Sequence, residues 1–147
     1  MKLKNKYNLQ SRFILSKHGI SRTKFRVMLL SLFFTSKKSL LIEDILEYFN
    51  NSINKVTVYR SLESFEKKGL IHQVPDRNNF KRYSLCKDEE CGISSHNHNH
   101  GHFICYSCNQ TFCVEDIKSP EITCLKGFDV KKLKLILEGY CAECIIN

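Results

Sequence analysis

Two pairs of cysteines constrain the fold of this chain more than any other feature. Each pair has the spacing Cys-x-x-Cys, and 32 residues separate the end of the first pair from the start of the second. Four thiolates form the complete tetrahedral shell of a structural zinc site and leave no position open for chemistry. We therefore expect a Zn²⁺ ion that ties a strand in the last third of the chain to the C-terminal end, bound by Cys105, Cys108, Cys141 and Cys144.

Eight cysteines in 147 residues could instead form the disulfides of a secreted protein. The N-terminal stretch Met1–Tyr7 is rich in lysine and lacks the apolar region of a secretory signal peptide. No apolar run in the sequence approaches the length that spans a bilayer. We therefore expect a cytoplasmic protein without a membrane partner, whose thiols stay reduced and bind metal.

The positive charge of the chain is concentrated in its N-terminal part. Residues 1–83 carry 17 Lys and Arg against 6 Asp and Glu, a net charge of +11, whereas residues 84–147 carry 6 against 9, a net charge of −3. A basic domain of this size indicates a polyanionic partner, most often nucleic acid. We therefore expect a basic, nucleic-acid-binding domain over 1–86, a histidine-rich hinge or insertion over 87–101, and a metal-binding domain over 102–147.

The order of elements predicted for the N-terminal domain is that of a winged helix-turn-helix. Apolar residues at helical spacing, with capping residues before them and glycine or asparagine after them, predict four helices. The helices cover residues 6–18, from Ser21 or Thr23 to Phe33, from Ser39 to Asn50, and from Asn54 to Gly69. Two strands, 70–74 and 81–85, then flank the turn-rich segment 75–79 and predict a β-hairpin.

The C-terminal domain is predicted to be a small α/β unit, which makes the whole chain α+β. A hairpin over Phe103–Val114 folds around the first Cys-x-x-Cys pair. Pro120 can begin a short helix that runs to about Lys126, and Gly127 ends it. The segment Phe128–Leu137 is rich in Val, Ile and Leu and predicts an extended strand.

Four histidines alternate with other residues just before the first cysteine pair, at positions 96, 98, 100 and 102. His102 lies three residues before Cys105, so a strand that holds the structural zinc also fixes His102. Alternate residues of a strand share a face, so we expect His100 and His102 to bind one ion together. Neutral imidazole suits Zn, Fe, Ni and Cu alike, and His98 is a possible additional ligand.

The predicted hairpin brings two more candidate ligands to the hinge between the domains. His72 lies near the start of its first strand, and Cys86 follows its second strand. A regulatory site made of His72 and Cys86 from one domain and His100 and His102 from the other would clamp the domains together. Metal binding would then be coupled to domain orientation, as a sensor requires. Cys113, on the strand after the cysteine turn, is a possible additional ligand.

Four sequence blocks resemble the ferric uptake regulator family of metal-responsive repressors, and the resemblance extends from about Gly19 to Cys144. The blocks are Thr23–Arg26, in which Phe25 replaces the usual proline, Thr57–Leu62 followed by Gly69-Leu70, His100–Cys108, and Gly139–Cys144. The resemblance implies a homodimer that binds palindromic double-stranded operator DNA with one winged helix per half-site. Two-fold protein symmetry is what a palindromic operator requires. Dimerisation through the C-terminal sheets is also implied.

The resemblance further implies that the helix after Asn54 reads the DNA. Arginine can bind guanine through two hydrogen bonds, and tyrosine can contact a base methyl group or a phosphate. Basic residues on the preceding helix would contact phosphate or the minor groove. The candidate DNA-binding residues are Tyr59, Arg60, Thr57, Ser61, Arg26 and Lys24.

Departures from the family pattern favour its zinc-sensing branch over the iron- and peroxide-sensing members. The iron- and peroxide-sensing members resemble one another in a histidine ligand at the position of Ser39 and in a carboxylate ligand at the position of Ser84. His72 and Cys86 match the ligand positions of zinc-sensing members, and Cys113 replaces a family carboxylate. Because thiolate ligands favour Zn²⁺ over Fe²⁺ or Mn²⁺, we expect the exchangeable regulatory metal to be Zn²⁺.

Two alternatives stay within the family. The chain could sense iron or another metal, and the insertion at 87–99 shifts the register, so that His98 or Cys91 could replace one of the regulatory ligands. Some relatives have an additional metal site that uses a histidine in the last strand. Leu133 stands there in this chain, and we expect that site to be absent.

Two alternatives lie outside the family. A zinc-storage protein or metallochaperone would account for the cysteines and histidines, but not for the basic N-terminal part or the Tyr59-Arg60 helix. A metalloenzyme needs an open metal position beside a general acid or base. The histidine run contains no Glu or Asp, so we expect no enzyme and no small-molecule substrate.

Overall fold

The structure is a computed structural model that describes residues 2–86, 100–118, 120–122 and 125–146. In chain order its elements are α1 (Lys2–Lys17), α2 (Lys24–Thr35), β1 (Leu40–Leu41), α3 (Ile42–Tyr48), α4 (Lys55–Lys67), β2 (Ile71–Val74), β3 (Arg82–Leu85), β4 (His100–Cys105), β5 (Thr111–Lys118), β6 (Ile136–Gly139) and α5 (Ala142–Ile145). None of the helices in this part of the chain is long and apolar enough to cross a bilayer.

Local capping explains where the N-terminal helices begin and end. The Thr23 side chain accepts a hydrogen bond from the backbone N–H of Arg26, and Asn54 accepts one from Val56 at 2.8 Å. These side chains satisfy backbone donors that a helix start otherwise leaves unpaired. Gly69 ends the turn after α4 with a φ of 74°, a left-handed conformation that glycine adopts without steric cost. The four predicted helices are confirmed, with Thr23 as the cap of α2, but α1 begins earlier than predicted, at Lys2, and α3 begins later, at Ile42, and ends at Tyr48.

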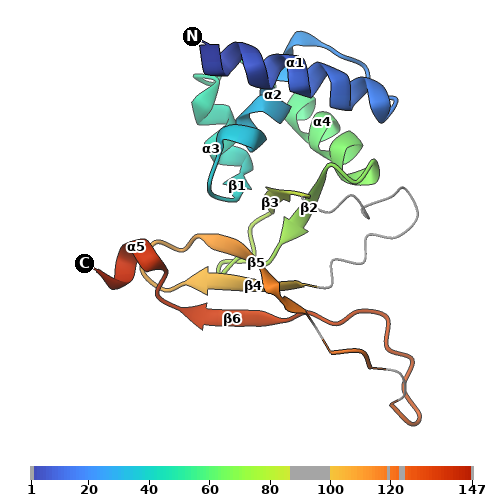
Figure 1. Ribbon diagram of the computed structural model, residues 1–147, viewed down its shortest axis with the longest axis vertical. Coiled ribbons are helices and arrows are strands. Elements are labelled where there is room, and N and C mark those ends of the chain that lie inside the picture. Colours follow the sequence, from blue (N-terminus) through green and yellow to red (C-terminus); the bar gives the residue numbers. More distant parts are fainter. Residues whose placement is uncertain (1, 87–99, 119, 123–124, 147) are drawn as a thin grey trace.

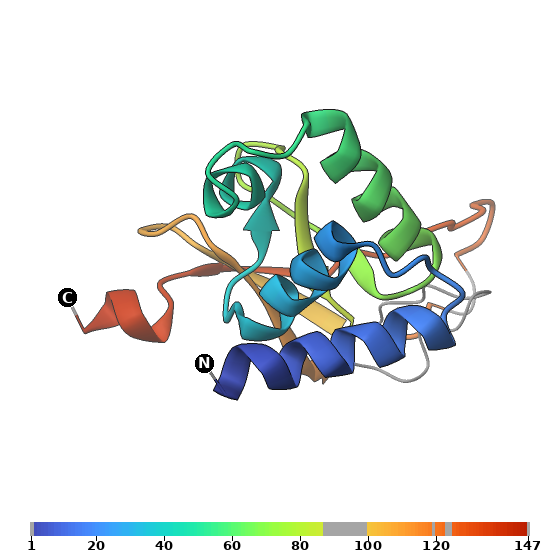
Figure 2. The same ribbon diagram turned by 90° about the horizontal axis from the view of Figure 1, so that it is seen from above.

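The N-terminal domain is a winged helix-turn-helix. Its core consists of aliphatic and aromatic side chains from α1 to α4, among which Leu15, Leu29, Leu30, Ile45 and Phe65 are fully buried. Figure 2 shows α1 lying alongside α2 on the outer side of this domain. The predicted hairpin forms as β2 and β3, and β1 adds a third strand, giving the order β1-β3-β2. The short strand β1 was not predicted, because Leu40 and Leu41 lack an extended pattern of their own.

The second domain is a three-stranded sheet below the first (Figure 1). Its order is β5-β4-β6, with β4 antiparallel to β5 and parallel to β6. The hairpin predicted around the first cysteine pair is therefore confirmed. The strand β4 begins at His100, two residues before the expected start of this domain. The α+β fold class is confirmed.

Two predictions for the C-terminal domain were wrong. The residues described between 120 and 126 form no helix, and Ile122 and Leu125 there are about half exposed. Because these side chains remain exposed, a short helix at this place would gain no packing energy to stabilise it. The strand predicted over 128–137 pairs only from Ile136 onward, whereas Phe128, at 73% exposure, lies outside the sheet. The one-turn helix α5 was not predicted.

A buried polar network joins the two domains. Arg82 on β3 forms an ion pair with Asp76 at 2.8 Å, and both side chains are at most 5% exposed. The guanidinium of Arg82 also donates to Gln110 of the second domain at 3.0 Å. The buried Ser39 hydroxyl donates to the backbone carbonyl of Thr111 at 2.8 Å.

Candidate metal centres

The four cysteines of the two Cys-x-x-Cys pairs lie together at one end of the second sheet. Cys105 ends β4, Cys108 lies in the turn to β5, Cys141 precedes α5, and Cys144 is part of α5. Their sulfur atoms all lie within 4.8 Å of one another. The Sγ atoms of Cys108 and Cys141 are 3.9 Å apart. Zn–S bonds of about 2.3 Å at tetrahedral angles place two sulfurs about 3.8 Å apart, so the set fits zinc.

The protein surroundings of these cysteines favour a thiolate on Cys105. Hydrogen bonds from the backbone N–H of Cys108, and then of Cys141 and Ser107, lower the pKa of Cys105 to about 6 against the cost of burial. The Ser107 hydroxyl lowers the pKa of Cys144, but hydrogen bonds with Cys141 and the other thiols outweigh it and raise that pKa to about 11. The crowded thiols share protons, and a bound metal ion would take the place of these protons.

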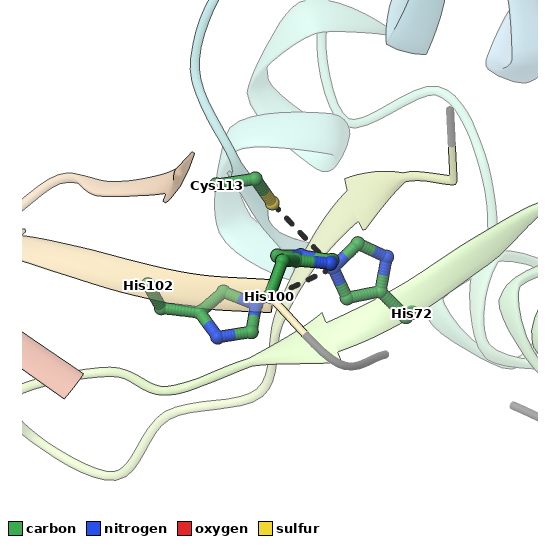
Figure 3. Close-up of side chains that lie close together, drawn as sticks. All are labelled: His72, His100, His102 and Cys113. Atoms are coloured by element: carbon green, nitrogen blue, oxygen red, sulfur yellow. Dashed lines mark hydrogen bonds between the residues drawn. The ribbon is translucent and has the colours of Figure 1, made fainter. Parts of the chain in front are cut away.

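A second cluster lies between the two domains (Figure 3). It consists of His72 on β2, His100 and His102 on β4, and Cys113 on β5, with one ligand atom from each residue within 4.8 Å of the others. His72 and His102 are at most 9% exposed. The rings of His100 and His102 lie 4.8 Å apart, on one side of the strand as expected. Cys113 faces His102 directly across the antiparallel pair.

The distances in this cluster also fit a tetrahedral ion. The Nε2 atom of His72 is 3.5 Å from Nε2 of His102 and 3.5 Å from Sγ of Cys113. Zn–N bonds of about 2.0–2.1 Å and Zn–S bonds of about 2.3 Å give separations of about 3.4 Å and 3.6 Å. One imidazole nitrogen has a single lone pair or a single proton for its neighbours. One cation bound by all these donor atoms therefore explains why they lie so close together better than hydrogen bonds do.

The cluster differs from the expected regulatory set in its cysteine, which is Cys113 and not Cys86. The structure brings together His72, His100 and His102, and it adds Cys113, which the sequence suggested only as an additional ligand. Cys86 lies instead at the other nitrogen of His72, with its Sγ 3.4 Å from Nδ1. His98 lies outside the described residues. The pairing of Cys113 with His102 depends on strand register, which no local sequence signal provided.

Most of the expected DNA-contacting side chains are exposed on the N-terminal domain. Thr57, Tyr59 and Arg60 on α4 are exposed, and Tyr59 is 40% exposed. Lys24 on α2 is exposed as well, whereas Arg26 is partly buried and hydrogen-bonds to the Ser21 hydroxyl. Ser61, in contrast, is only 3% exposed and faces the core of its domain.

A winged helix-turn-helix joined to a small domain by clustered histidines and cysteines defines a metal-responsive DNA-binding regulator. The chain belongs to the ferric uptake regulator family, since the profile of the "Ferric uptake regulator family" matches residues 17–138. The family inferred from the sequence blocks is thus confirmed.

Individual relatives support the assignment. The ferric uptake regulation protein of Staphylococcus epidermidis is 30% identical over 139 residues, which cover 89% of this chain and 91% of that protein. A zinc uptake regulator solved in complex with zinc and DNA shares the fold with a TM-score of 0.67 at 20% identity, over 97% of this chain and 95% of that one. The ferric uptake regulator from Francisella tularensis, solved with iron, has a TM-score of 0.57 at 28% identity, over 86% and 96%.

Proposed function

We propose that this protein is a zinc-responsive transcriptional repressor that binds palindromic operator DNA as a homodimer when its regulatory site is filled. The observation that carries the proposal is the position of the second cluster. His72 comes from the winged-helix domain, whereas His100, His102 and Cys113 come from the other domain. An ion bound by all four fixes the orientation of the DNA-binding helix relative to the second domain, so its binding energy is coupled to DNA binding.

The donor set supports zinc as the regulatory metal. Three imidazoles and one thiolate form a nitrogen–sulfur shell without a carboxylate. Thiolate favours Zn²⁺ over the harder Fe²⁺ and Mn²⁺, which prefer carboxylate oxygen. An iron-responsive regulator is the second candidate, because the curated relatives include ferric uptake regulation proteins.

The first cluster, in this proposal, holds a structural Zn²⁺ on Cys105, Cys108, Cys141 and Cys144. A closed shell of four thiolates exchanges no ligand with solvent and leaves no place for a substrate. The protein is therefore a regulator and not an enzyme, and it acts in the cytoplasm, where thiols stay reduced.

DNA binding and dimerisation use different parts of the chain in this proposal. Thr57, Tyr59 and Arg60 of α4 read the major groove, and Lys24 and Arg26 contact the backbone. The domain over 102–147 dimerises, and exposed apolar side chains in the edge strand β6 and in the chain before and after it support this role. They are Phe128, Val130, Leu133, Ile136 and Tyr140. A zinc-storage role would leave both surfaces without a purpose.

The test begins with DNA duplexes selected from a random pool by the zinc-loaded protein. Binding of a selected duplex is then measured by fluorescence anisotropy at buffered free Zn²⁺, Fe²⁺ or Mn²⁺, with the structural zinc left in place. We expect Zn²⁺ to raise the affinity at least tenfold and added salt to lower it steeply, because lysine and arginine displace counterions from DNA. Affinity that does not change when the exchangeable metal is removed would contradict the proposal. A response to Fe²⁺ alone would favour the iron-responsive candidate.

A further inference from the structure

We propose that the two cysteines beside His72 have different roles. Cys113 supplies the thiolate of the regulatory site, whereas Cys86 stays outside the metal shell and positions the His72 ring through its other nitrogen. The inference rests on the proposed function only in that the second cluster binds a metal ion.

The two nitrogens of His72 have different neighbours. Nε2 faces the donor atoms of His102 and Cys113, each at 3.5 Å. Nδ1 faces the sulfur of Cys86 at 3.4 Å. The lone-pair directions of the two nitrogens diverge in the plane of an imidazole ring. A metal ion held at Nε2 therefore has the ring between itself and Cys86.

Cys86 is also absent from the set of described residues whose ligand atoms all lie within 4.8 Å of one another. Its backbone N–H donates to the carbonyl of Leu70 at 2.9 Å, which holds it at the end of the hairpin beside β2. Turning the His72 ring by 180° would place carbon atoms at both contacts. The observed orientation is thus the one that uses both nitrogens.

This arrangement selects one protonation state of His72. A histidine that binds metal through Nε2 carries its proton on Nδ1 and donates it to an acceptor, which fixes the ring and makes the ligand nitrogen more basic. That acceptor is most often a carboxylate, a backbone carbonyl or water. Here the sulfur of Cys86 takes its place. Cys86 is therefore a positioning residue.

Substitution by serine and alanine separates the two roles. The exchangeable metal is replaced by Co²⁺ while the structural zinc stays bound, and the sulfur-to-cobalt charge-transfer absorption reports thiolate ligands directly. We expect Cys113→Ser to abolish this absorption and Cys86→Ser to retain it. Cys86→Ala should also retain the absorption but weaken Co²⁺ binding about 10–100-fold, the usual loss when the partner of a ligating histidine is removed.

X-ray absorption of the cobalt-loaded wild type provides a second measurement that does not depend on any variant. We expect one sulfur and three nitrogens around the exchangeable ion. Two sulfurs, or loss of charge transfer in Cys86→Ser, would overturn the inference, and so would absorption retained by Cys113→Ser. If cobalt binds as expected but DNA affinity does not respond to metal, the proposed function fails while this assignment stands.

Discussion

At the scale of single residues, the ion pair of Asp76 and Arg82 is almost inaccessible to solvent, whereas the pairs Lys55–Glu43, Lys67–Glu63 and Lys131–Asp129 are exposed. Burial raises the pKa of Asp76, but the Arg82 side chain and the backbone N–H groups of Asn78 and Phe80 outweigh it, so the net pKa is lowered. Arg82 also reaches Gln110 in the other domain. The buried guanidinium of Arg82 therefore stabilises both the β2–β3 hairpin and the contact between the two domains.

Removal of this guanidinium should be costly. We expect Arg82→Ala to lower the free energy of unfolding by about 3–5 kcal/mol, because Asp76 is left buried without its partner. Lys67→Ala is the matched control, since its pair with Glu63 is exposed on both sides and is worth about 0.5 kcal/mol or less. Urea unfolding of both zinc-loaded variants measures the difference. Equal stabilities would show that the pair contributes nothing.

The lowered pKa of Asp76 also predicts a pH dependence. A carboxyl group whose pKa is depressed by folding contributes stability above its ordinary pKa of about 3.9, and the contribution is lost as the pH falls through the folded value. Asp76→Asn should therefore be less stable than wild type at pH 7, and the gap should narrow below about pH 4. Zinc content is measured at each pH, and the two proteins are compared only where both keep their zinc. A gap that is constant from pH 7 to pH 3 would contradict this origin.

At the scale of elements, the turn between β4 and β5 serves two purposes. It contains Cys108 of the first cluster, and it receives the wing of the N-terminal domain. Arg77 donates to the carbonyl of Tyr106 at 3.1 Å, and the Thr111 hydroxyl donates to the carbonyl of Pro75 at 2.6 Å. In the proposed function, a zinc ion bound by Cys108 and the other three cysteines would therefore stabilise the surface on which the β2–β3 hairpin lies.

Loss of the structural zinc should unfold the second domain. Zinc binding in small cysteine-rich modules is worth about 10–16 kcal/mol, whereas a whole domain is stable by about 5–15 kcal/mol. We expect Cys141→Ser to lose one zinc per chain and the amide NMR signals of β4–β6, while the helical signals of α1–α4 persist on their own core. A Cys141→Ser protein that keeps its zinc and a folded sheet would be inconsistent with a structural role for this site.

The N-terminal elements were predictable because their signals are local. Thr23, Asn54 and Gly69 cap helices through neighbours within a few residues, and apolar spacing marks the core. The position of Cys113 opposite His102 and the edge position of β6 depend on strand pairing between distant segments, which the sequence does not encode locally. The sequence and the resemblance to the family predicted His72 and His102, which the structure brings together, and they placed Cys86 ahead of Cys113 as the sulfur ligand. Only the three-dimensional arrangement distinguishes the two nitrogens of His72.

At the scale of the whole molecule, the basic N-terminal domain should carry the contact with DNA. We expect Arg60→Ala to weaken binding to the selected duplex by about 1–3 kcal/mol, since a base-reading arginine is lost. Lys126→Ala, which removes an exposed charge from the second domain, is the control and should leave the affinity nearly unchanged. If both variants weakened binding alike, only overall charge would matter.

The coupling between the second cluster and DNA binding is tested most directly by one comparison. Affinity for the selected duplex is measured for wild type and His72→Ala, each with its structural zinc, at low and at saturating free Zn²⁺. We predict that Zn²⁺ raises the wild-type affinity at least tenfold and leaves His72→Ala unchanged at the low value, because the ion no longer joins the domains. A zinc response of the same size in His72→Ala would contradict this mechanism.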